Sequence, residues 1–282
     1  MHKKIVSLLM VCMALGTLHA QDKKLVVLHT NDTHSCIMPL NPNLADTTKA
    51  DRGGFVRRVA MVNEERKKTP SLLLIDSGDF SQGSPYYTLF KGDVEIGLMN
   101  EMKYDASTIG NHEFDFGVEN MARIFKKAQF PILCANYDFT GTALDGVVKP
   151  YTVVERNGLR IGLFAVDPKM DGLVIAKNCQ GLKYLDPVAS AQKAVDKLKS
   201  MRCDAIICIS HLGWNIGGDD DNKLIANTRG IDLVLGGHSH SLLKELVYVK
   251  NLDGKEIPVD QNGKNAVYVG KLVLDFKKEK KQ

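Results

Sequence analysis

Apolar runs of strand length recur along the chain, and each run ends in glycine or polar residues. They are rich in β-branched residues, which favour strands, so we expect each run to form one. In chain order the runs are "KLVVLHTND", "SLLLIDSGD", "DASTIGNHE", "PILCANYD", "DAIICISHLG" and "DLVLGGHSH".

Helical patterns lie between these runs. Residues 53–68, "GGFVRRVAMVNEERKK", place apolar side chains on one side of a helix and charges on the other. Residues 187–200 begin with a proline after Asp186, which is typical of a helix start, and then repeat apolar residues at helical spacing. Strands and helices alternate along the chain, and this alternation predicts the α/β fold class.

Two further segments read as strands. The segment "YTVVERNGLRIGLFAV" contains two β-rich runs around Asn157 and Gly158, a pair typical of a hairpin turn. The segment "AVYVGKLVLDF" predicts either a strand pair or one long strand. The chain has no internal repeat, low-complexity tract or evident linker, so a single domain is the simplest prediction.

The first twenty residues have the pattern of a secretory signal peptide. Two lysines precede an apolar run that ends near Leu18, and small residues follow near Ala20. We expect residues 1–20 to be removed after Ala20, because the apolar run is short for a membrane span; a retained membrane anchor is the alternative. No later segment approaches the length of a membrane span, which predicts an exported protein, periplasmic or extracellular, without a span in the mature chain.

The net charge and the number of cysteines argue against a nucleic-acid partner and against a fully disulfide-paired chain. The 282-residue chain carries a net charge of +4, and removing residues 1–20 takes away Lys3 and Lys4 and no acid, which leaves +2. This small excess does not favour a nucleic-acid partner. Five cysteines remain after the signal peptide, an odd number that excludes complete disulfide pairing within one chain. We expect Cys134 and Cys208, which lie in apolar runs, to be buried thiols.

Polar side chains that could bind metal follow the predicted strands. In open α/β sheets, ligands bind beyond the carboxyl ends of the strands. The candidates at these ends are Asp32, His34, Asp79, Asn111, His112, Asp115, His211, His238 and His240. Imidazole with carboxylate suits zinc, manganese, iron or cobalt, and the absence of cysteine from the set disfavours a structural zinc site.

Two pairs of candidates share a spacing of two residues. Asp32 and His34 would converge if the backbone between them is extended, and His238 and His240 repeat the spacing. The glycines before His238 would let that backbone approach the site closely. His29 lies inside the first predicted strand, where we expect a structural role.

Five motifs in a fixed order resemble a known family. They are "HTNDTH", "DSGDFSQGSP", "GNHEFDFG", "SHLG" and "GGHSH", and together they resemble the calcineurin-like metallophosphoesterases, with the longer strings most similar to the bacterial 5'-nucleotidase group. The resemblance covers about residues 24–275. It implies a four-layer α/β/β/α sandwich, with residues 21–282 as the catalytic domain.

The resemblance also implies a site with two divalent metal ions, of zinc, manganese, cobalt or iron. By match to the motifs, the ligands of one ion are Asp32, His34 and His240. The ligands of the other ion are Asn111, His211 and His238. Asp79 would bridge the two ions, while His112 and Asp115 match the catalytic pair of the family.

Such a site suits phosphoester hydrolysis. Two divalent ions and two ionised aspartates leave a formal charge of about +2, which favours a phosphate dianion and a hydroxide. The hydroxide held by the ions would attack phosphorus in line. His112 would protonate or stabilise the leaving group, and Asp115 would orient His112.

The motifs imply phosphoester hydrolysis, but they leave several substrates open. In the large exported nucleotidases of the family a further C-terminal domain binds the base, whereas nothing follows "LVLDFKKEKKQ" here; one hypothesis is that a separate partner protein supplies that domain, and another is that the chain acts alone. We predict hydrolysis of phosphate monoesters, of nucleotides in particular. The alternatives are a broad-range phosphatase, a cyclic-nucleotide phosphodiesterase, an enzyme for sulfur-containing substrates, or a weakly active metal-binding subunit. The His112–Asp115 pair weighs against the last, since holding metal does not require it.

Overall fold

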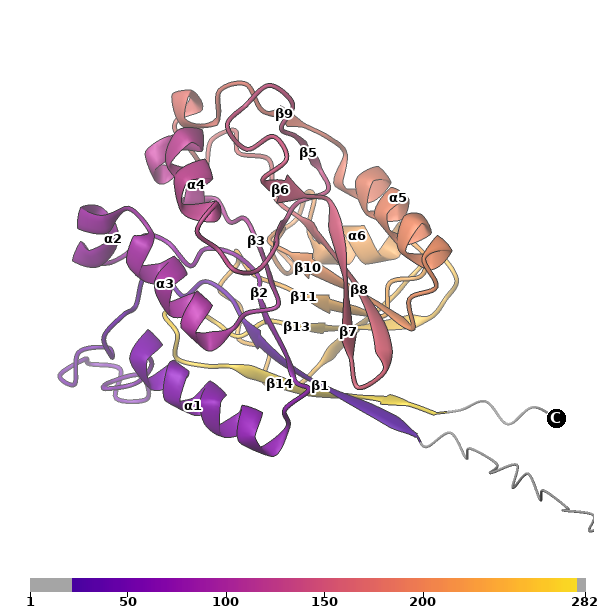
Figure 1. Ribbon diagram of the computed structural model, residues 1–282, viewed down its shortest axis with the longest axis horizontal. Coiled ribbons are helices and arrows are strands. Elements are labelled where there is room, and N and C mark those ends of the chain that lie inside the picture. Colours follow the sequence, from indigo (N-terminus) through magenta and orange to yellow (C-terminus); the bar gives the residue numbers. More distant parts are fainter. Residues whose placement is uncertain (1–21, 278–282) are drawn as a thin grey trace, which may run out of the picture.

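Two six-stranded β-sheets pack face to face in the computed structural model, which describes residues 22–277 (Figure 1). The predicted signal peptide at residues 1–20 lies outside this range. Helices α1 (Phe55–Lys68), α3 (Asp93–Met102) and α4 (Gly117–Phe125) cover the outer face of one sheet, and α5 (Pro187–Ser200) and α6 (Asp221–Ala226) cover the outer face of the other (Figure 1).

The first sheet has the strand order β14-β1-β2-β3-β4-β6. The bounds of its strands are β1 (Lys23–Thr30), β2 (Leu73–Asp76), β3 (Ala106–Thr108), β4 (Ile132–Leu133), β6 (Val148–Lys149) and β14 (Gly270–Phe276). Neighbouring strands are parallel except β14, which pairs antiparallel with β1. The C-terminal segment thus forms one strand, the second of the two arrangements that its sequence allowed.

The second sheet has the order β12-β13-β11-β10-β8-β7. The bounds are β7 (Tyr151–Arg156), β8 (Leu159–Val166), β10 (Ala205–Ser210), β11 (Leu233–Leu235), β12 (Val247–Lys250) and β13 (Glu256–Asp260). A separate two-stranded sheet pairs β5 (Tyr137–Asp138) with β9 (Lys183–Tyr184). The predicted hairpin is confirmed, because β7 and β8 pair antiparallel across Asn157 and Gly158, both with positive φ, as a tight hairpin turn requires.

The described residues form six α-helices and two 3₁₀ helices (η1 and η2), and a side chain caps the N-terminus of three of them. Their bounds are α1 (Phe55–Lys68), α2 (Pro85–Phe90), α3 (Asp93–Met102), η1 (His112–Phe116), α4 (Gly117–Phe125), η2 (Ala176–Cys179), α5 (Pro187–Ser200) and α6 (Asp221–Ala226). The helix predicted at 187–200 is confirmed, and the Asp186 side chain caps it by accepting a hydrogen bond from the backbone N–H of Ala189. The helix predicted at 53–68 begins two residues later, after Gly54.

Alternating side chains of the strands separate the apolar interior into three layers. In β2, Leu73 and Ile75 pack between the two sheets, whereas Leu74 packs beneath the helices of the first sheet. In β10, Ile207 packs between the sheets and Cys208 packs beneath α5 and α6. The chain is therefore a four-layer α/β/β/α sandwich, as predicted, with both faces of its central strands buried.

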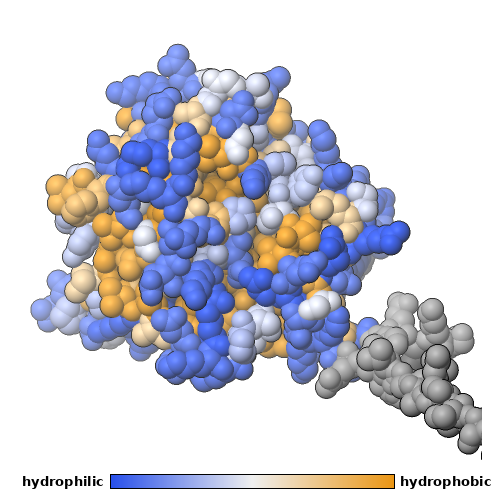
Figure 2. All heavy atoms as spheres, viewed as in Figure 1, coloured by the Kyte–Doolittle hydropathy of each residue, from blue (hydrophilic) through white to orange (hydrophobic). Residues whose placement is uncertain are grey.

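Exposed apolar side chains gather on one part of the outer surface. Figure 2 shows apolar side chains gathered at the position of α2, where Tyr86, Leu89 and Phe90 are exposed.

Cys134 and Cys208 are buried thiols, as predicted, and the cysteines of the described part are all free. Within residues 22–277, no helix has both the length and the apolar character that a membrane crossing requires.

Candidate metal centre

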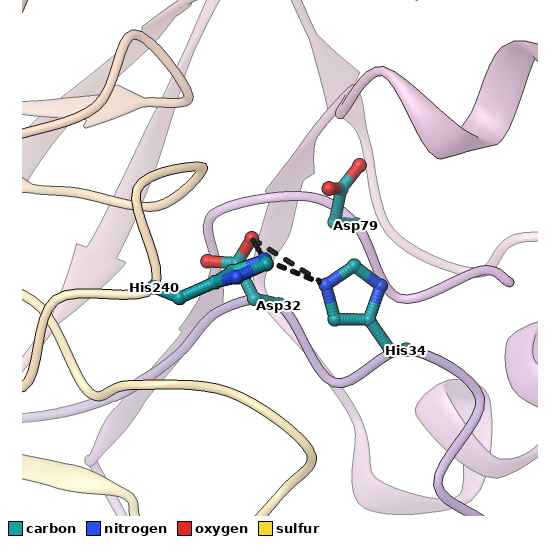
Figure 3. A group of neighbouring side chains, drawn as sticks. All are labelled: Asp32, His34, Asp79 and His240. Atoms are coloured by element: carbon teal, nitrogen blue, oxygen red, sulfur yellow. Dashed lines mark hydrogen bonds and ion pairs between the residues drawn. The ribbon is translucent and has the colours of Figure 1, made fainter. Parts of the chain in front are cut away.

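The loops that follow β1, β2, β3, β10 and β11 bring the predicted site residues together. Two groups of side chains each offer ligand atoms within 4.8 Å of one another. The first, here called the open group, comprises Asp32, His34, Asp79 and His240 (Figure 3). The second, here called the buried group, comprises Asp79, His211 and His238. Asp79 belongs to both groups, so the two clusters are adjacent.

In the open group, two imidazole nitrogens face each other and a carboxylate oxygen lies beside them. The Nε2 atoms of His34 and His240 lie 2.9 Å apart. Oδ1 of Asp32 lies 3.5 Å from the His240 Nε2 and 3.9 Å from the His34 Nε2 (Figure 3). Nitrogen lone pairs and a carboxylate that converge in this way suit a divalent cation.

In the buried group, one histidine nitrogen lacks a partner. His211 Nδ1 lies 2.6 Å from the carbonyl oxygen of Ser77, which places its proton on Nδ1 and leaves the lone pair on Nε2. Nε2 lies 3.2 Å from Asp79 Oδ2, yet it has no hydrogen-bond partner in residues 22–277 although it is buried. His238 Nδ1 lies 2.9 Å from Asn111 Oδ1 beside it. An unsatisfied buried nitrogen beside a carboxylate and an amide oxygen fits a metal ligand set.

The backbone at the ligands differs from our expectation. An extended backbone was the condition under which we expected Asp32 and His34 to converge, but their φ angles are 47° and 45°; His238 and His240 have φ of 70° and 54°. These left-handed conformations are rare for residues with a side chain. They are stabilised by hydrogen bonds between loops, such as that from the N–H of Asp32 to the carbonyl of Gly78 at 2.9 Å. Convergence therefore arises from turns in the backbone and not from strand geometry.

Two glycines permit the close approach of the ligand loops. A Cβ on Gly110 would lie 2.1 Å from Asp79 Oδ1, and a Cβ on Gly237 would lie 2.7 Å from the carbonyl oxygen of Ser77. A side chain at either position would displace the loop that carries a ligand. The predicted role of the glycines before His238 is confirmed for Gly237.

Burial controls the protonation of the candidate ligands. Burial lowers the pKa of His34 and of His238 to about 4, so both imidazoles are neutral at pH 7, the form that binds metal. Burial raises the pKa of Asp32 to about 7, although nearby His211 opposes this. Burial alone would raise the pKa of Asp79 too, but the surrounding histidines His211, His34 and His112 together outweigh burial and hold this pKa below its usual range. A bound cation favours the ionised form of both carboxylates.

His112 and Asp115 form a pair at the rim of the open group. His112 Nδ1 lies 3.2 Å from Asp115 Oδ2, and the ring meets that of His34 edge-on with centroids 5.4 Å apart. The backbone N–H of His112 donates to Asp79 Oδ1 at 2.9 Å, which couples the pair to both ligand groups. Burial lowers the pKa of His112, but the hydrogen bond to Asp115 and the charge of Asp79 outweigh it, so this pKa is raised. The raised pKa favours a ring that can donate a proton.

Glu113 is a site residue that the sequence analysis did not single out. Its fully buried carboxylate accepts hydrogen bonds from the N–H groups of Asp79 at 3.1 Å, Ser81 at 3.0 Å and Gly110 at 2.5 Å. These bonds hold the loop after β2 against the loop after β3. The signal was its place inside "GNHEFDFG", next to a candidate catalytic histidine.

His29 has the structural role expected for it. It lies in β1, fully buried, with Nδ1 2.8 Å from Asp260 Oδ2 and Nε2 3.0 Å from Ser77 Oγ. Because the Ser77 carbonyl binds His211, the His29 ring supports the loop on which a candidate ligand depends.

Comparisons with known proteins identify the family of this chain. The sequence profile of the calcineurin-like phosphoesterase family matches residues 25–242. A 5'-nucleotidase of Homo sapiens is 34% identical over 273 residues, which cover 90% of this chain and 46% of that protein. The chain spans about half the length of the curated 5'-nucleotidases that it matches.

Solved structures show the same fold. The 5'-nucleotidase precursor from Thermus thermophilus is similar with a TM-score of 0.82 at 32% identity, covering 90% of this chain and 52% of that one. A calcineurin-like phosphoesterase from Bacillus subtilis is similar with a TM-score of 0.73 at 27% identity, covering 92% of this chain and 87% of that one. With its profile match over most of its length, its four-layer sandwich and its paired ligand groups, this chain belongs to the calcineurin-like phosphoesterase family.

Proposed function

We propose that this chain hydrolyses phosphate monoesters, nucleotides among them, at a centre of two divalent metal ions. The observation that carries the proposal is the sharing of Asp79 between two groups of ligand side chains, with the His112–Asp115 pair at the rim. A site with two adjacent ions suits phosphoryl chemistry, because charge develops on both the entering and the leaving oxygen.

Different residues of the chain would bind each ion and protonate the leaving group. Asp32, His34 and His240 would hold one ion, Asn111, His211 and His238 the other, and Asp79 both. When bound, the ions supply Lewis-acid activation of water and neutralise charge on the phosphate oxygens. His112 donates a proton to the leaving oxygen as the phosphorus–oxygen ester bond breaks. Asp115 holds the imidazole of His112 in the tautomer and orientation that this transfer requires.

The likeness to 5'-nucleotidases supports nucleotides as substrates. A broad-range phosphatase and a cyclic-nucleotide phosphodiesterase share the same chemistry and are the competing activities. Export, the signal peptide at 1–20 and a partner chain that contributes to substrate binding stay predictions from the sequence.

A substrate panel tests the proposal. Residues 21–282 would be assayed with p-nitrophenyl phosphate, AMP, ADP and a cyclic nucleotide in manganese, cobalt or zinc, with a chelated sample as control. We expect metal-dependent release of phosphate from the monoesters and loss of this release in the chelated sample. Hydrolysis of the cyclic nucleotide alone would favour the phosphodiesterase instead. Absence of metal-dependent hydrolysis from every substrate would refute the proposed function.

A further inference from the structure

An open pocket of about 540 Å³ adjoins the open group on the side of His112. The side chains of His34, His112 and His240 line one part of it. Two segments, residues 34–41 after β1 and residues 82–86, which run into the first turn of α2, form most of the remaining wall. The pocket therefore lies where a group attached to the reacting phosphorus would extend past the proton donor.

Backbone contacts fix the shape of this pocket. Gly83 has φ +118°, and a Cβ there would lie 2.6 Å from the carbonyl oxygen of His34, so glycine allows segment 82–86 to lie directly against loop 34–41. Two backbone hydrogen bonds secure loop 34–41: the N–H of Leu40 donates to the carbonyl of Arg52 at 2.8 Å, and that of Phe55 to the carbonyl of Cys36 at 3.0 Å. The wall is thus a formed surface that a ligand need not organise.

The pocket is lined by apolar, aromatic and cationic side chains. Met38 and Tyr86, whose exposed fractions are 59% and 39%, present apolar and aromatic surface beside Pro85. None of the described residues that line the pocket is acidic, and Lys264 contributes an ammonium group whose charge acts on His240 and which forms no ion pair with residues 22–277. Lys264 is placed there by its neighbour Asn265, whose N–H donates to the carbonyl of Asp32 at 2.8 Å. An aromatic wall with an unpaired cation suits a flat leaving group that carries negative charge.

We infer that this pocket binds the leaving group of the substrate and selects leaving groups that carry an aromatic or heteroaromatic ring and a second anionic group, such as the AMP released from ADP, over those of small alkyl esters. The inference rests on the proposed function, because it takes His112 as the donor to the leaving oxygen. Tyr86 would contact the ring and Lys264 the second anionic group.

The Tyr86→Ala variant tests the ring contact. Stacking of a ring on an aromatic side chain contributes about 1–3 kcal/mol, so KM for phenyl phosphate should rise roughly 5-fold or more. The kcat for phenyl phosphate and both constants for ethyl phosphate should stay unchanged. Tyr248→Ala is the matched control, since Tyr248 is an exposed tyrosine on β12 that does not line the pocket.

The Lys264→Ala variant tests the anionic contact. Hydrolysis of ADP releases AMP, whose remaining phosphate would lie near Lys264, whereas hydrolysis of AMP releases neutral adenosine. An exposed ion pair contributes up to about 1 kcal/mol, so KM for ADP should rise about 3-fold, with little change for AMP. Lys264→Arg should restore KM, and Lys250→Ala on β12 is the matched control.

A binding measurement separates failure of this inference from failure of the proposed function. Phenylphosphonate and methylphosphonate resist hydrolysis, so calorimetry on the metal-loaded protein measures their binding without turnover. Tyr86→Ala should weaken phenylphosphonate about 5-fold relative to methylphosphonate. If both ligands weaken equally, or neither does, the ring-selective pocket is wrong even where hydrolysis is observed. Selective weakening without hydrolysis of any ester would keep the pocket and refute the proposed function.

Discussion

The two ligand groups differ in how the fold surrounds them. His211, in the buried group, has no solvent exposure and is bound through Nδ1 to a backbone carbonyl. His240, in the open group, has a side chain that is 35% exposed and lines the pocket beside the site. The buried group is therefore part of the interior of the sandwich, whereas the open group faces incoming ligands. The difference predicts that equivalent substitutions in the two groups will have unequal effects on stability.

Asp79→Asn should have the largest effect, because Asp79 belongs to both groups. Loss of its charge removes the anionic ligand that the groups share, so we expect both ions to be lost and kcat/KM to fall by about three orders of magnitude or more. Metal content after dialysis, measured by mass spectrometry, checks this. Retention of two ions per chain would show that Asp79 does not bridge.

His112→Ala should lower kcat while leaving both ligand groups intact, because His112 lies at the rim of the open group and is not one of its ligands. General acid catalysis contributes about 10²–10⁴ in rate, so kcat should fall within that range with metal content unchanged. The loss should be smaller for p-nitrophenyl phosphate than for AMP, because p-nitrophenolate leaves readily without a proton. Loss of metal with the side chain would contradict the role assigned to His112.

His211→Ala and His240→Ala compare the two groups directly. Removing His211 takes away the N–H that the buried Ser77 carbonyl accepts and leaves a cavity beside Asp79, so the free energy of unfolding should fall by about 2–4 kcal/mol in chelator. His240→Ala, at a partly exposed position, should change it by less than about 1 kcal/mol. Urea denaturation with excess chelator measures both. Equal losses would remove the distinction between the groups.

Glu113→Gln should have a smaller effect on the metal centre than Asp79→Asn, because Glu113 contacts the loops and not the ions. The amide NH₂ cannot accept the hydrogen bonds that the second carboxylate oxygen accepts, so metal affinity should fall about 10–100-fold, as is typical for groups that support ligands. Glu119→Gln, on the exposed part of α4, is a matched control. An unchanged metal affinity in Glu113→Gln would limit this residue to folding.

Local sequence determined the elements and the chemical types at the site. The β-branched apolar runs, the Asn157–Gly158 turn and the Asp186 cap each specify local structure through short-range preferences, and the structure contains all three. The placement of histidine and aspartate after strands predicted a common site, because parallel strands end at one edge of a sheet.

Tertiary structure decided how those groups meet. His34 and His240 are 206 residues apart in the chain, and their contact depends on the order of strands in two sheets that no local pattern specifies. The left-handed backbone at Asp32, His34, His238 and His240 is likewise unfavourable locally and exists because hydrogen bonds between loops stabilise it. The role of Glu113 depends on N–H groups from two loops. Sequence thus determined which groups the site contains, and long-range packing decided their distances and burial, since both depend on contacts between segments far apart in the chain.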